Sequence, residues 1–148
     1  MKDIKVKVGS YLEIGKDAQV VRDEVFCVEQ EISQDIERDS YDAIAMYVVL
    51  YKDNEPIATG RIIEKDDKYL VGRVATLREH RGNGYGSVIV KSLVDWAFEN
   101  NISEVYIHSQ KHAEGFYEKI GFQAFGEVFY EAGIEHVNMI CKRERRGG

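Results

Sequence analysis

The chain has 148 residues, of which 44% are hydrophobic and one is proline, enough sequence for one globular domain with a real core. We expect that domain to span residues 1–148. Lys and Arg total 20 against 26 Asp and Glu, a formal charge of −6, which argues against a broad nucleic-acid-binding surface. The basic cluster at 142–146 is terminal, and we expect this tail to be solvated and partly disordered.

The chain lacks a run long enough to span a bilayer, and its N-terminus lacks the apolar core and cleavage site of a signal peptide. We therefore expect a cytoplasmic protein without a membrane partner. Cys27 and Cys141 stand far apart and match no redox spacing. No set of His, Cys and carboxylate residues has metal-ligand spacing, so no metal is predicted.

The first third of the chain predicts a strand, a helix and a loop. Residues 3–9 alternate as a short strand. Asp17 is predicted to cap a helix whose apolar positions recur at helical spacing, at Val20, Val21, Val25 and Val28. The acidic segment 33–42 lacks hydrophobic periodicity and is predicted to be a surface loop. Such a loop is either a solvated connection or a cover over an active site.

The remaining elements predict a mixed sheet. Three strands at 44–52, 57–64 and 69–77 are joined by short turns and form an antiparallel meander. A helix over 87–100 crosses to a strand at 105–108, which must then run parallel to the strand before the helix. A helix at 111–120 ends at Gly121, and strands at 122–125 and 137–142 follow. We predict an α+β fold with a mixed, mostly antiparallel twisted sheet flanked by helices.

A glycine-rich stretch, Arg81-Gly82-Asn83-Gly84-Tyr85-Gly86-Ser87, opens the crossover helix. Glycine costs about 1 kcal/mol relative to alanine inside a helix, so three glycines here need another reason. Glycine allows positive φ and close approach of a ligand, and a helix N-terminus offers unpaired N–H groups, which together favour a phosphate. The alternative is a flexible turn in which the glycines only relieve steric crowding.

Two familiar phosphate-binding motifs do not match this stretch. A Walker A loop needs Lys-Ser or Lys-Thr after its second glycine, and none is present. A Rossmann fingerprint needs glycine at the position of Ser87 and an acidic residue after the next strand, where Ser109 and Gln110 stand. The antiparallel strands before the loop also argue against a doubly wound sheet.

The stretch resembles the Arg/Gln-x-x-Gly-x-Gly/Ala signature of the GNAT superfamily of N-acetyltransferases. Residues 113–122 resemble the Ala-x-x-Phe/Leu-Tyr-x-x-x-Gly-Phe element of the same superfamily. Segments 22–30 and 129–139 resemble its ElaA/YjcF-like branch. The resemblance implies the GNAT-like (acyl-CoA N-acyltransferase) fold, with a sheet splayed between the strand ending near Leu77 and the strand starting near Val105.

The resemblance also implies acetyl-CoA as the acetyl donor. Its pyrophosphate would lie on the backbone N–H groups of the glycine stretch, and its pantetheine arm along the preceding strand. Many members carry Asn at the position of Gln110, which offers the same amide groups on a longer side chain. The expected cofactor-binding residues are Val74, Ala75, Thr76, Arg81, Gly82, Asn83, Gly84, Tyr85, Gly86, Ser87, Gln110, Phe116 and Tyr117.

The catalytic roles follow from the same alignment. Tyr117 matches the tyrosine that protonates the departing thiolate, although it could also be a core residue, and the Thr76 N–H could stabilise an oxyanion. The acceptor amine must lose a proton, and the candidates for base or substrate contact are Glu29, His136 and Glu131. Each has a simpler alternative: a helix-end carboxylate is commonly solvated, and a histidine beside a strand commonly satisfies a local hydrogen bond.

The resulting hypothesis is an acetyl-CoA-dependent N-acetyltransferase. The enzyme would acetylate a primary amine of an unidentified small molecule or protein by direct attack in a ternary complex. The alternatives are a non-catalytic acyl-CoA-binding regulatory or scaffold module, and an interaction domain that binds no CoA. The apolar edge of the last strands is compatible with a homodimer.

Overall fold

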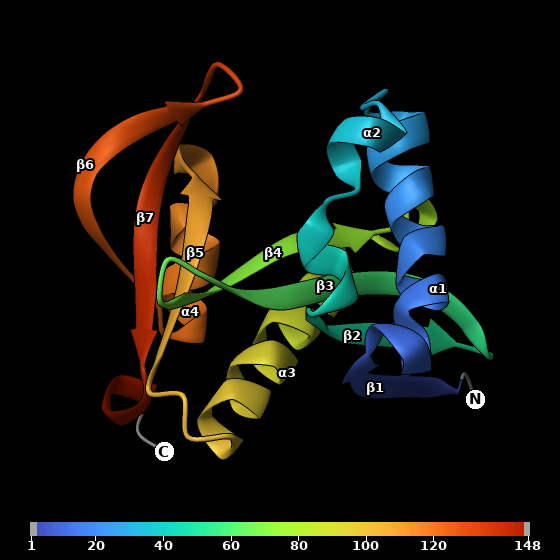
Figure 1. The fold of residues 1–148 in the computed structure, drawn as a ribbon, viewed down its shortest axis with the longest axis horizontal. Coiled ribbons are helices and arrows are strands. Elements are labelled where there is room, and N and C mark those ends of the chain that lie inside the picture. Colours follow the sequence, from blue (N-terminus) through green and yellow to red (C-terminus); the bar gives the residue numbers. More distant parts are fainter. Residues whose placement is uncertain (1–2, 147–148) are drawn as a thin grey trace.

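The computed structural model describes residues 3–146 and contains one seven-stranded sheet in the order β1-β2-β3-β4-β5-β7-β6 (Figure 1). The strands are β1 (Ile4–Ser10), β2 (Met46–Lys52), β3 (Glu55–Lys65), β4 (Lys68–Thr76), β5 (Glu104–Gln110), β6 (Gln123–Glu131) and β7 (Ile134–Lys142). The longer helices are α1 (Tyr11–Arg22), its π-helical continuation η1 (Asp23–Glu29), α3 (Tyr85–Glu99) and α4 (Glu114–Ile120). Short turns complete the chain: α2 (Gln34–Glu37), η2 (Ser40–Ala43), η3 (Arg78–His80), η4 (Lys111–Ala113) and η5 (Arg143–Arg146).

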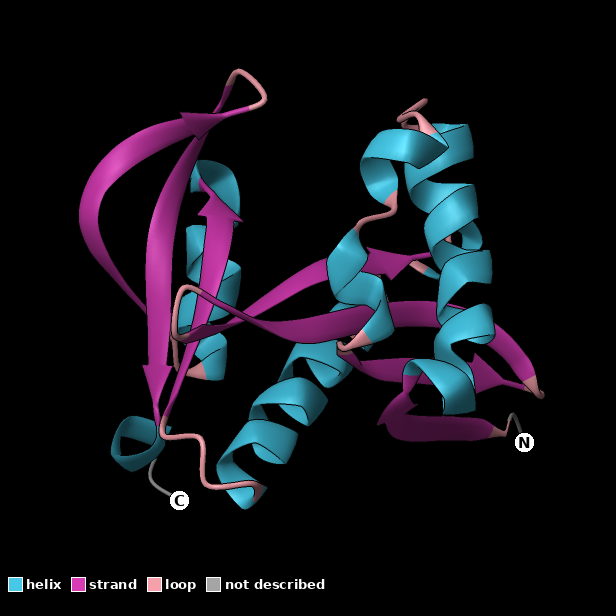
Figure 2. Cartoon of the chain, in the orientation of Figure 1, coloured by secondary structure: helices cyan, strands magenta, loops and turns pink. Residues whose placement is uncertain are grey.

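Helices cover both faces of the sheet (Figure 2). Along β2, Tyr47 and Val49 pack with α1, while Val48 and Leu50 pack with α3. This is the period-two alternation of a strand whose two faces are both buried. Apolar residues of α4, β5 and β7 extend the α3 side of the core. The order of strands and helices agrees with the sequence-based prediction, and the mixed α+β fold is confirmed.

The sheet opens between β4 and β5. These two strands run parallel, as predicted. Only Tyr69–Val71 of β4 pairs with Val105–Ile107 of β5, and beyond these residues the strands diverge. A β-bulge begins directly after the last pair, because β4 carries one residue more than β3 between two paired positions. Arg73 lies in this bulge at φ +51°. The divergence divides the molecule into a β1–β4 half and a β5–β7 half (Figure 1).

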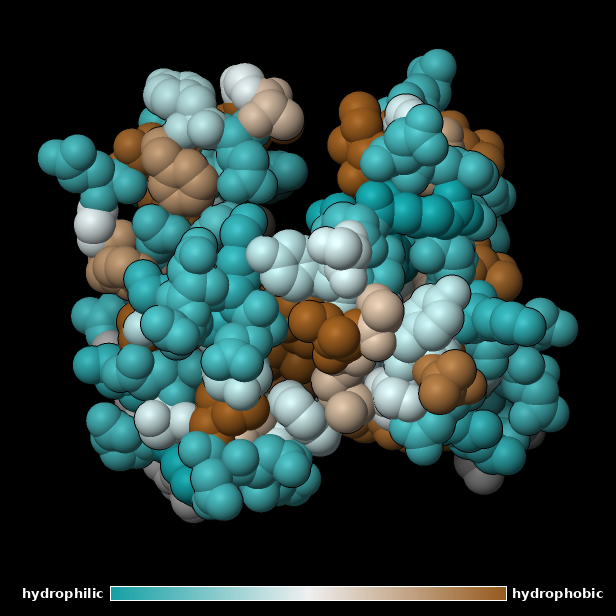
Figure 3. All heavy atoms as spheres, in the orientation of Figure 1, coloured by the Kyte–Doolittle hydropathy of each residue, from teal (hydrophilic) through white to brown (hydrophobic). Residues whose placement is uncertain are grey.

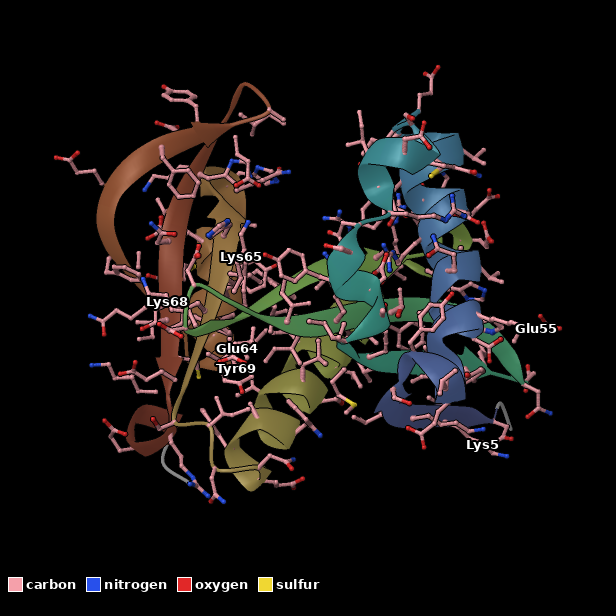
Figure 4. All side chains as sticks on the ribbon, viewed as in Figure 1. Lys5, Glu55, Glu64, Lys65, Lys68 and Tyr69 are labelled. Atoms are coloured by element: carbon pink, nitrogen blue, oxygen red, sulfur yellow. The ribbon has the colours of Figure 1, made fainter. Side chains whose placement is uncertain are left out.

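The β3–β4 hairpin keeps contact with the β5–β7 half. Its tip carries Lys65 and Lys68 to that side of the molecule (Figure 4). The Lys68 ammonium lies 5.1 Å from the centre of the Tyr106 ring of β5. The two halves are therefore joined at the closed end of the opening and separate toward the other end.

The first helix starts earlier than predicted. It begins at Tyr11 behind Ser10, whose N–H donates to Glu13 Oε1 at 2.7 Å. Ser10-x-x-Glu13 is a capping-box signal, and it starts the helix here although residues 10–16 are largely polar. Asp17 lies inside α1, where it accepts a hydrogen bond from the Tyr51 hydroxyl at 2.6 Å. The expected cap at Asp17 was therefore wrong.

The apolar face of this helix is also narrower than predicted. Val21 and Val25 are buried, whereas Val20 is 55% and Val28 is 66% exposed. The change from α-helix to π-helix at Asp23 alters the angle between successive side chains, so 3.6-residue spacing does not continue to Val28.

Segment 33–42 is not the solvated loop that its composition suggests. It forms α2 and η2, and the Glu37 side chain is buried. Ser33 caps α2 by accepting from the Asp35 N–H at 3.2 Å. The acidic residues of this segment instead meet arginines from α1, β3 and β4, which sequence periodicity does not reveal.

The C-terminal part forms a longer hairpin than predicted. β6 and β7 pair antiparallel around a turn at Ala132–Gly133, with an irregularity between Phe125 and Phe129. Residues 143–146 of the tail expected to be solvated form η5, while 147–148 lie outside the described residues. Among residues 3–146, no helix is long and apolar enough to span a membrane.

Candidate active site

The glycine stretch forms a turn whose backbone is open to a ligand. Gly82 and Gly84 have φ of +83° and +79°, conformations that favour glycine. A Cβ built at either position would meet nothing within 4 Å. Gly84 is the N-cap of α3, and the first hydrogen bond of the helix runs from the Val88 N–H to the Gly84 carbonyl. The N–H groups of residues 85–87 precede that bond and form the anion-attracting end of a 15-residue helix.

Arg81 stabilises this turn by hydrogen bonds to two other elements. Its guanidinium donates to both carboxylate oxygens of Glu29, at 2.7 and 2.6 Å, and its Nε donates to the Thr76 carbonyl at 2.9 Å. Hydrogen bonds from Arg81 hold the pKa of Glu29 below its ordinary value. Arg81 therefore ties the end of η1 to the end of β4.

The predicted base Glu29 is thus placed beside the glycine turn. It lines a shallow surface hollow with Arg78 and Glu79 and does not line the central cavity. An ionised carboxylate in a bidentate ion pair is a weak proton acceptor. The expected location of Glu29 in the substrate cleft differs from its location here.

Other residues of the stretch have supporting positions. The Asn83 side chain donates to the His80 carbonyl at 3.1 Å and so closes the turn on itself. Tyr85 packs against the α3 core. A Cβ at Gly86 would lie 3.8 Å from the Phe116 ring, so α4 flanks the turn at its far side. Phe116 is 42% exposed and is therefore not simply a core residue.

A cavity of about 380 Å³ occupies the opening between β4 and β5. Figure 3 shows the molecule hollowed between its two upper masses. The cavity lining comes from every element around the opening: Phe26, Gln30, Ile32, Ile36, Glu37, Val71, Gly72, Arg73, Val74, Ile107, His108, Gln110, Ala113, Tyr117, Glu131 and His136. Five predicted site residues outside the glycine stretch therefore share one cavity: Val74, Gln110, Tyr117, Glu131 and His136.

The Thr76 N–H faces the open side of β4. The next residue, Leu77, donates its N–H to the Ile57 carbonyl of β3 at 2.9 Å. Successive backbone groups of a strand point to opposite edges, so Thr76 presents its N–H away from β3. Ala75 is buried and pairs with Thr59, which anchors this end of the strand.

Tyr117 projects from α4 into the cavity. Its ring packs at right angles against Phe116 and Phe122, with centroids 5.0 and 6.0 Å away. Burial raises the pKa of the Tyr117 hydroxyl, which therefore keeps its proton at neutral pH. No residue of 3–146 accepts a hydrogen bond from this hydroxyl, so the proton is available to a ligand.

His136 lines the same cavity from β7. Its Nδ1 lies 2.7 Å from the Ile134 carbonyl, which can only accept, so Nδ1 carries the proton of the neutral ring. The ring stacks on Phe129 at 5.7 Å, which fixes its plane. Nε2 of the neutral imidazole then has a free lone pair, the form that a general base requires.

Two further polar residues lie next to His136. Gln110 is its direct cross-strand neighbour on β5. Glu131 accompanies it in the cavity, with one carboxylate oxygen 3.3 Å from His108 Nδ1. The structure therefore brings together His136, Glu131 and Gln110, which were predicted as separate cofactor and substrate residues, and it adds His108, which ranked low from the sequence.

The wall on the α1 side contains a buried charge cluster that sequence reasoning missed. Arg22 is 1% exposed and binds Glu37 and Asp42, while Arg61 is 4% exposed and binds Asp39 and Asp42. An arginine among the apolar residues of α1 was the available signal, because a buried arginine requires acidic partners. These pairs fix α2 and η2, and thereby one wall of the cavity.

Asp23, Cys27 and Glu37 gather close enough to share a metal ion. Both carboxylates already bind guanidinium groups, Asp23 to Arg38 at 2.8 Å and Glu37 to Arg22 at 2.5 Å. A cation would compete with these arginines for the carboxylate oxygens, so the cluster supports no metal site.

A parallel strand pair that splays beside a glycine-rich helix N-terminus places the chain in the class of acyl-CoA N-acyltransferase folds, in agreement with the solved structures that it resembles. The family model described as the acetyltransferase (GNAT) domain matches residues 12–143. The chain therefore belongs to the GNAT acetyltransferase family, whose members use acetyl-CoA or another acyl-CoA as donor substrate.

Individual relatives agree with this assignment. The uncharacterized N-acetyltransferase YjcF of Bacillus subtilis is 34% identical over 126 residues, which cover 84% of this chain and 90% of YjcF. The crystal structure of Escherichia coli ElaA is 26% identical with a TM-score of 0.81, covering 95% of this chain and 100% of ElaA. A crystal structure from Lactobacillus plantarum is 30% identical with a TM-score of 0.85, covering 94% and 97%. The predicted resemblance to the ElaA/YjcF-like branch is confirmed.

Proposed function

We propose that this protein is an acetyl-CoA-dependent N-acetyltransferase that acetylates a primary amine by direct attack in a ternary complex. The observation that carries the proposal is the cavity between β4 and β5, because it contains both a protonated phenol and an imidazole with a free Nε2. Amide formation from a thioester needs a proton acceptor for the amine and a proton donor for the thiolate.

The glycine turn would hold the pyrophosphate of the donor. The backbone N–H groups from Gly82 to Ser87 supply the contacts, and the dipole of α3 favours the negative charge. The pantetheine arm would follow the open edge of β4 at Val74–Thr76 and reach the Gln110 amide across the opening. Arg81 would act indirectly by holding the turn, because its guanidinium is already engaged by Glu29.

Three groups would carry the chemistry. His136 Nε2 accepts the proton that the amine loses as the new N–C bond forms. The Thr76 N–H stabilises negative charge on the carbonyl oxygen, and the Tyr117 hydroxyl gives its proton to the sulfur as the C–S bond breaks. Transfer of the proton from His136 to solvent and return of a proton to Tyr117 complete the cycle. Glu131 would orient the amine, and Glu29 would keep a structural part.

Cofactor binding is tested by thermal unfolding with and without acetyl-CoA. A ligand at 100 times its Kd adds about 2.7 kcal/mol, and we expect Gly84→Asp to abolish most of the resulting rise in Tm because its carboxylate would meet the pyrophosphate. Gly126→Asp is a matched control, since Gly126 also has positive φ and open space but lies in β6. The absence of any shift with acetyl-CoA or CoA would contradict the proposal.

Catalysis is tested by release of free CoA thiol over a panel of amines. We expect Tyr117→Phe and His136→Gln to lower kcat by about 10- to 1,000-fold while the acetyl-CoA shift in Tm stays. Binding of acetyl-CoA without thiol release for any amine would favour the alternative, a non-catalytic acyl-CoA-binding module.

A further inference from the structure

Arg73 has a backbone conformation that a regular β-strand does not contain. It is the non-glycine residue of the β4 bulge with φ +51°, a conformation that commonly costs about 1 kcal/mol or more for such a residue. The side chain lines the central cavity directly beside the end of the β4–β5 pairing. Strain of this kind persists only where surrounding contacts determine the geometry.

Contacts with α2 hold the Arg73 side chain on one wall of the cavity. Its Nε and Nη2 donate to the Glu37 carbonyl at 3.1 and 2.9 Å, and Nη2 lies 3.4 Å from Asp39 Oδ2. Nη1 has no hydrogen-bond partner among residues 3–146, and the side chain is 30% exposed. The guanidinium is therefore fixed at the cavity wall, with Nη1 unused by the described residues.

The charge on the opposite wall has the other sign. Glu131 lies in the cavity with His108 and His136, on strands β5 to β7. Glu37, the other cavity carboxylate, is already engaged by Arg22 and lies 3.6 Å from Arg73 Nε, so it carries no free charge for a ligand. One cavity thus presents on the α2 side an ion-paired guanidinium whose Nη1 is unused, and a negative group beside the proposed base.

The wall next to Arg73 is apolar. Phe26 of η1, Ile32 of the following turn and Ile36 of α2 line the cavity together with Glu37. Ile36 is 72% exposed although its side chain borders the cavity. Burying such a side chain against an apolar ligand group would stabilise the complex.

We propose that the acceptor is a free α-amino acid with an apolar side chain, whose carboxylate binds Arg73 Nη1. The ammonium group would be attracted by Glu131 and would lose one proton to solvent before attack, and His136 would accept the second proton as the N–C bond forms. The side chain would pack on Phe26, Ile32 and Ile36. The inference rests on the proposed function and names the acceptor class for the same site. A charge-assisted hydrogen bond to a buried carboxylate is strong enough to select such a substrate.

The test compares L-leucine with 3-methylbutylamine, which differs from it by the carboxylate, and L-phenylalanine with 2-phenylethylamine. kcat/KM for thiol release is measured for wild type and Arg73→Met. We expect the ratio of amino acid to amine to fall about tenfold or more in Arg73→Met, through loss of activity toward the amino acid. Because the ratio is compared between two proteins, the different pKa values of the amines cancel.

Arg143→Met is the matched control, since Arg143 is exposed in η5, away from the cavity, and its loss should leave the ratio unchanged. Thermal unfolding shows whether Arg73→Met is folded, and Arg73→Lys provides a second variant that keeps the charge without the planar edge. An equal ratio in wild type and Arg73→Met, or a wild-type preference for the decarboxylated amines, overturns the inference.

A binding measurement separates the two proposals. Calorimetric titration of L-leucine and L-phenylalanine into the CoA-saturated protein does not require turnover. Arg73-dependent binding without thiol release would leave the acceptor inference standing and refute catalysis. If the protein acetylates simple amines but neither binds nor acetylates the amino acids, catalysis stands and the acceptor inference is refuted.

Discussion

Asp42→Asn tests whether the buried charge cluster determines the stability of this fold. The Asp42 carboxylate accepts from Arg22 at 2.7 and 3.1 Å, from Arg61 at 2.7 Å and from the Tyr47 hydroxyl at 2.9 Å. Asparagine keeps the shape and one acceptor oxygen. Its amide NH2 would replace Oδ2, which accepts from Arg22 Nη2 and the Asp39 N–H.

The cost follows from these contacts. Two hydrogen bonds become donor-to-donor contacts and the negative charge between two buried guanidinium groups is lost. Breaking a buried pair in this way costs about 3–5 kcal/mol. With an unfolding entropy near 0.3 kcal/mol/K for 148 residues, the expected fall in Tm is about 10–16 °C.

The assay is thermal unfolding at pH 7 and at successively lower pH. Burial alone would raise the pKa of Asp42, but the hydrogen bonds and charges of Arg22, Tyr47 and Arg61 outweigh it and hold that pKa well below its ordinary value. A depressed folded-state pKa gives stability above the unfolded value of about 3.9 and loses it below. The difference between wild type and Asp42→Asn should therefore shrink as pH falls from 5 toward 2.

The control is Asp67→Asn in the β3–β4 turn. Asp67 is exposed and has φ +63°, which asparagine adopts readily. We expect its Tm to stay within about 2 °C of wild type. A loss below about 1 kcal/mol for Asp42→Asn, or a difference that persists unchanged at pH 2, would refute the reasoning.

Three further predictions concern packing and catalysis. Gly60→Ala places a Cβ 2.7 Å from an isoleucine methyl of α3 and should lower the free energy of unfolding by about 1–3 kcal/mol. The control is Gly72→Ala, whose Cβ meets nothing within 4 Å and should change that free energy little. Chemical denaturation measures both variants. In a thiol-release assay, Glu29→Gln should lower kcat less than threefold, whereas His136→Gln should lower it at least about tenfold. A larger loss for Glu29→Gln than for His136→Gln would show that Glu29 is the base. Because burial raises the pKa of Tyr117, Tyr117→Phe should reduce kcat by one constant factor from pH 7 to 9, and a factor that falls with pH would show that the phenol ionises in this range.

The sequence was informative where the determinants are local. Turn residues around 53–56 and 65–68 correctly divided β2, β3 and β4. The glycine stretch placed the start of α3 to within two residues, and Gly121 correctly ended α4. Parallel pairing of β4 and β5 followed from the handedness of a crossover helix.

The failures have a common physical origin in partners distant along the chain. Arg22 meets Glu37 and Asp42, which are 15 and 20 residues away, and no periodicity connects them. Segment 33–42 was therefore expected to be either a solvated connection or a cover over an active site, whereas it forms short helical turns and lines the cavity with Ile36 and Glu37. Glu29 meets Arg81 across 52 residues, which draws its carboxylate to the glycine turn.

Part of the site was predictable and part was not. The glycine stretch and Tyr117 come from short motifs with a physical basis, and His136 and Glu131 from flanking segments. Arg73 gave no signal, because a bulge depends on the register of two strands and not on the residues within one.

The divergence of β4 from β5 has a consequence for the ligand-free molecule. Beyond Val71, the outward backbone N–H groups of β4 lack strand partners on the β5 side, so they should exchange with solvent deuterium much faster than those facing β3. The β1–β4 and β5–β7 halves are paired only at Tyr69–Val71 and Val105–Ile107, so they should rotate slightly relative to each other about this short contact. A ligand lying along the open edge would slow this exchange and stiffen the molecule, acting as a missing strand.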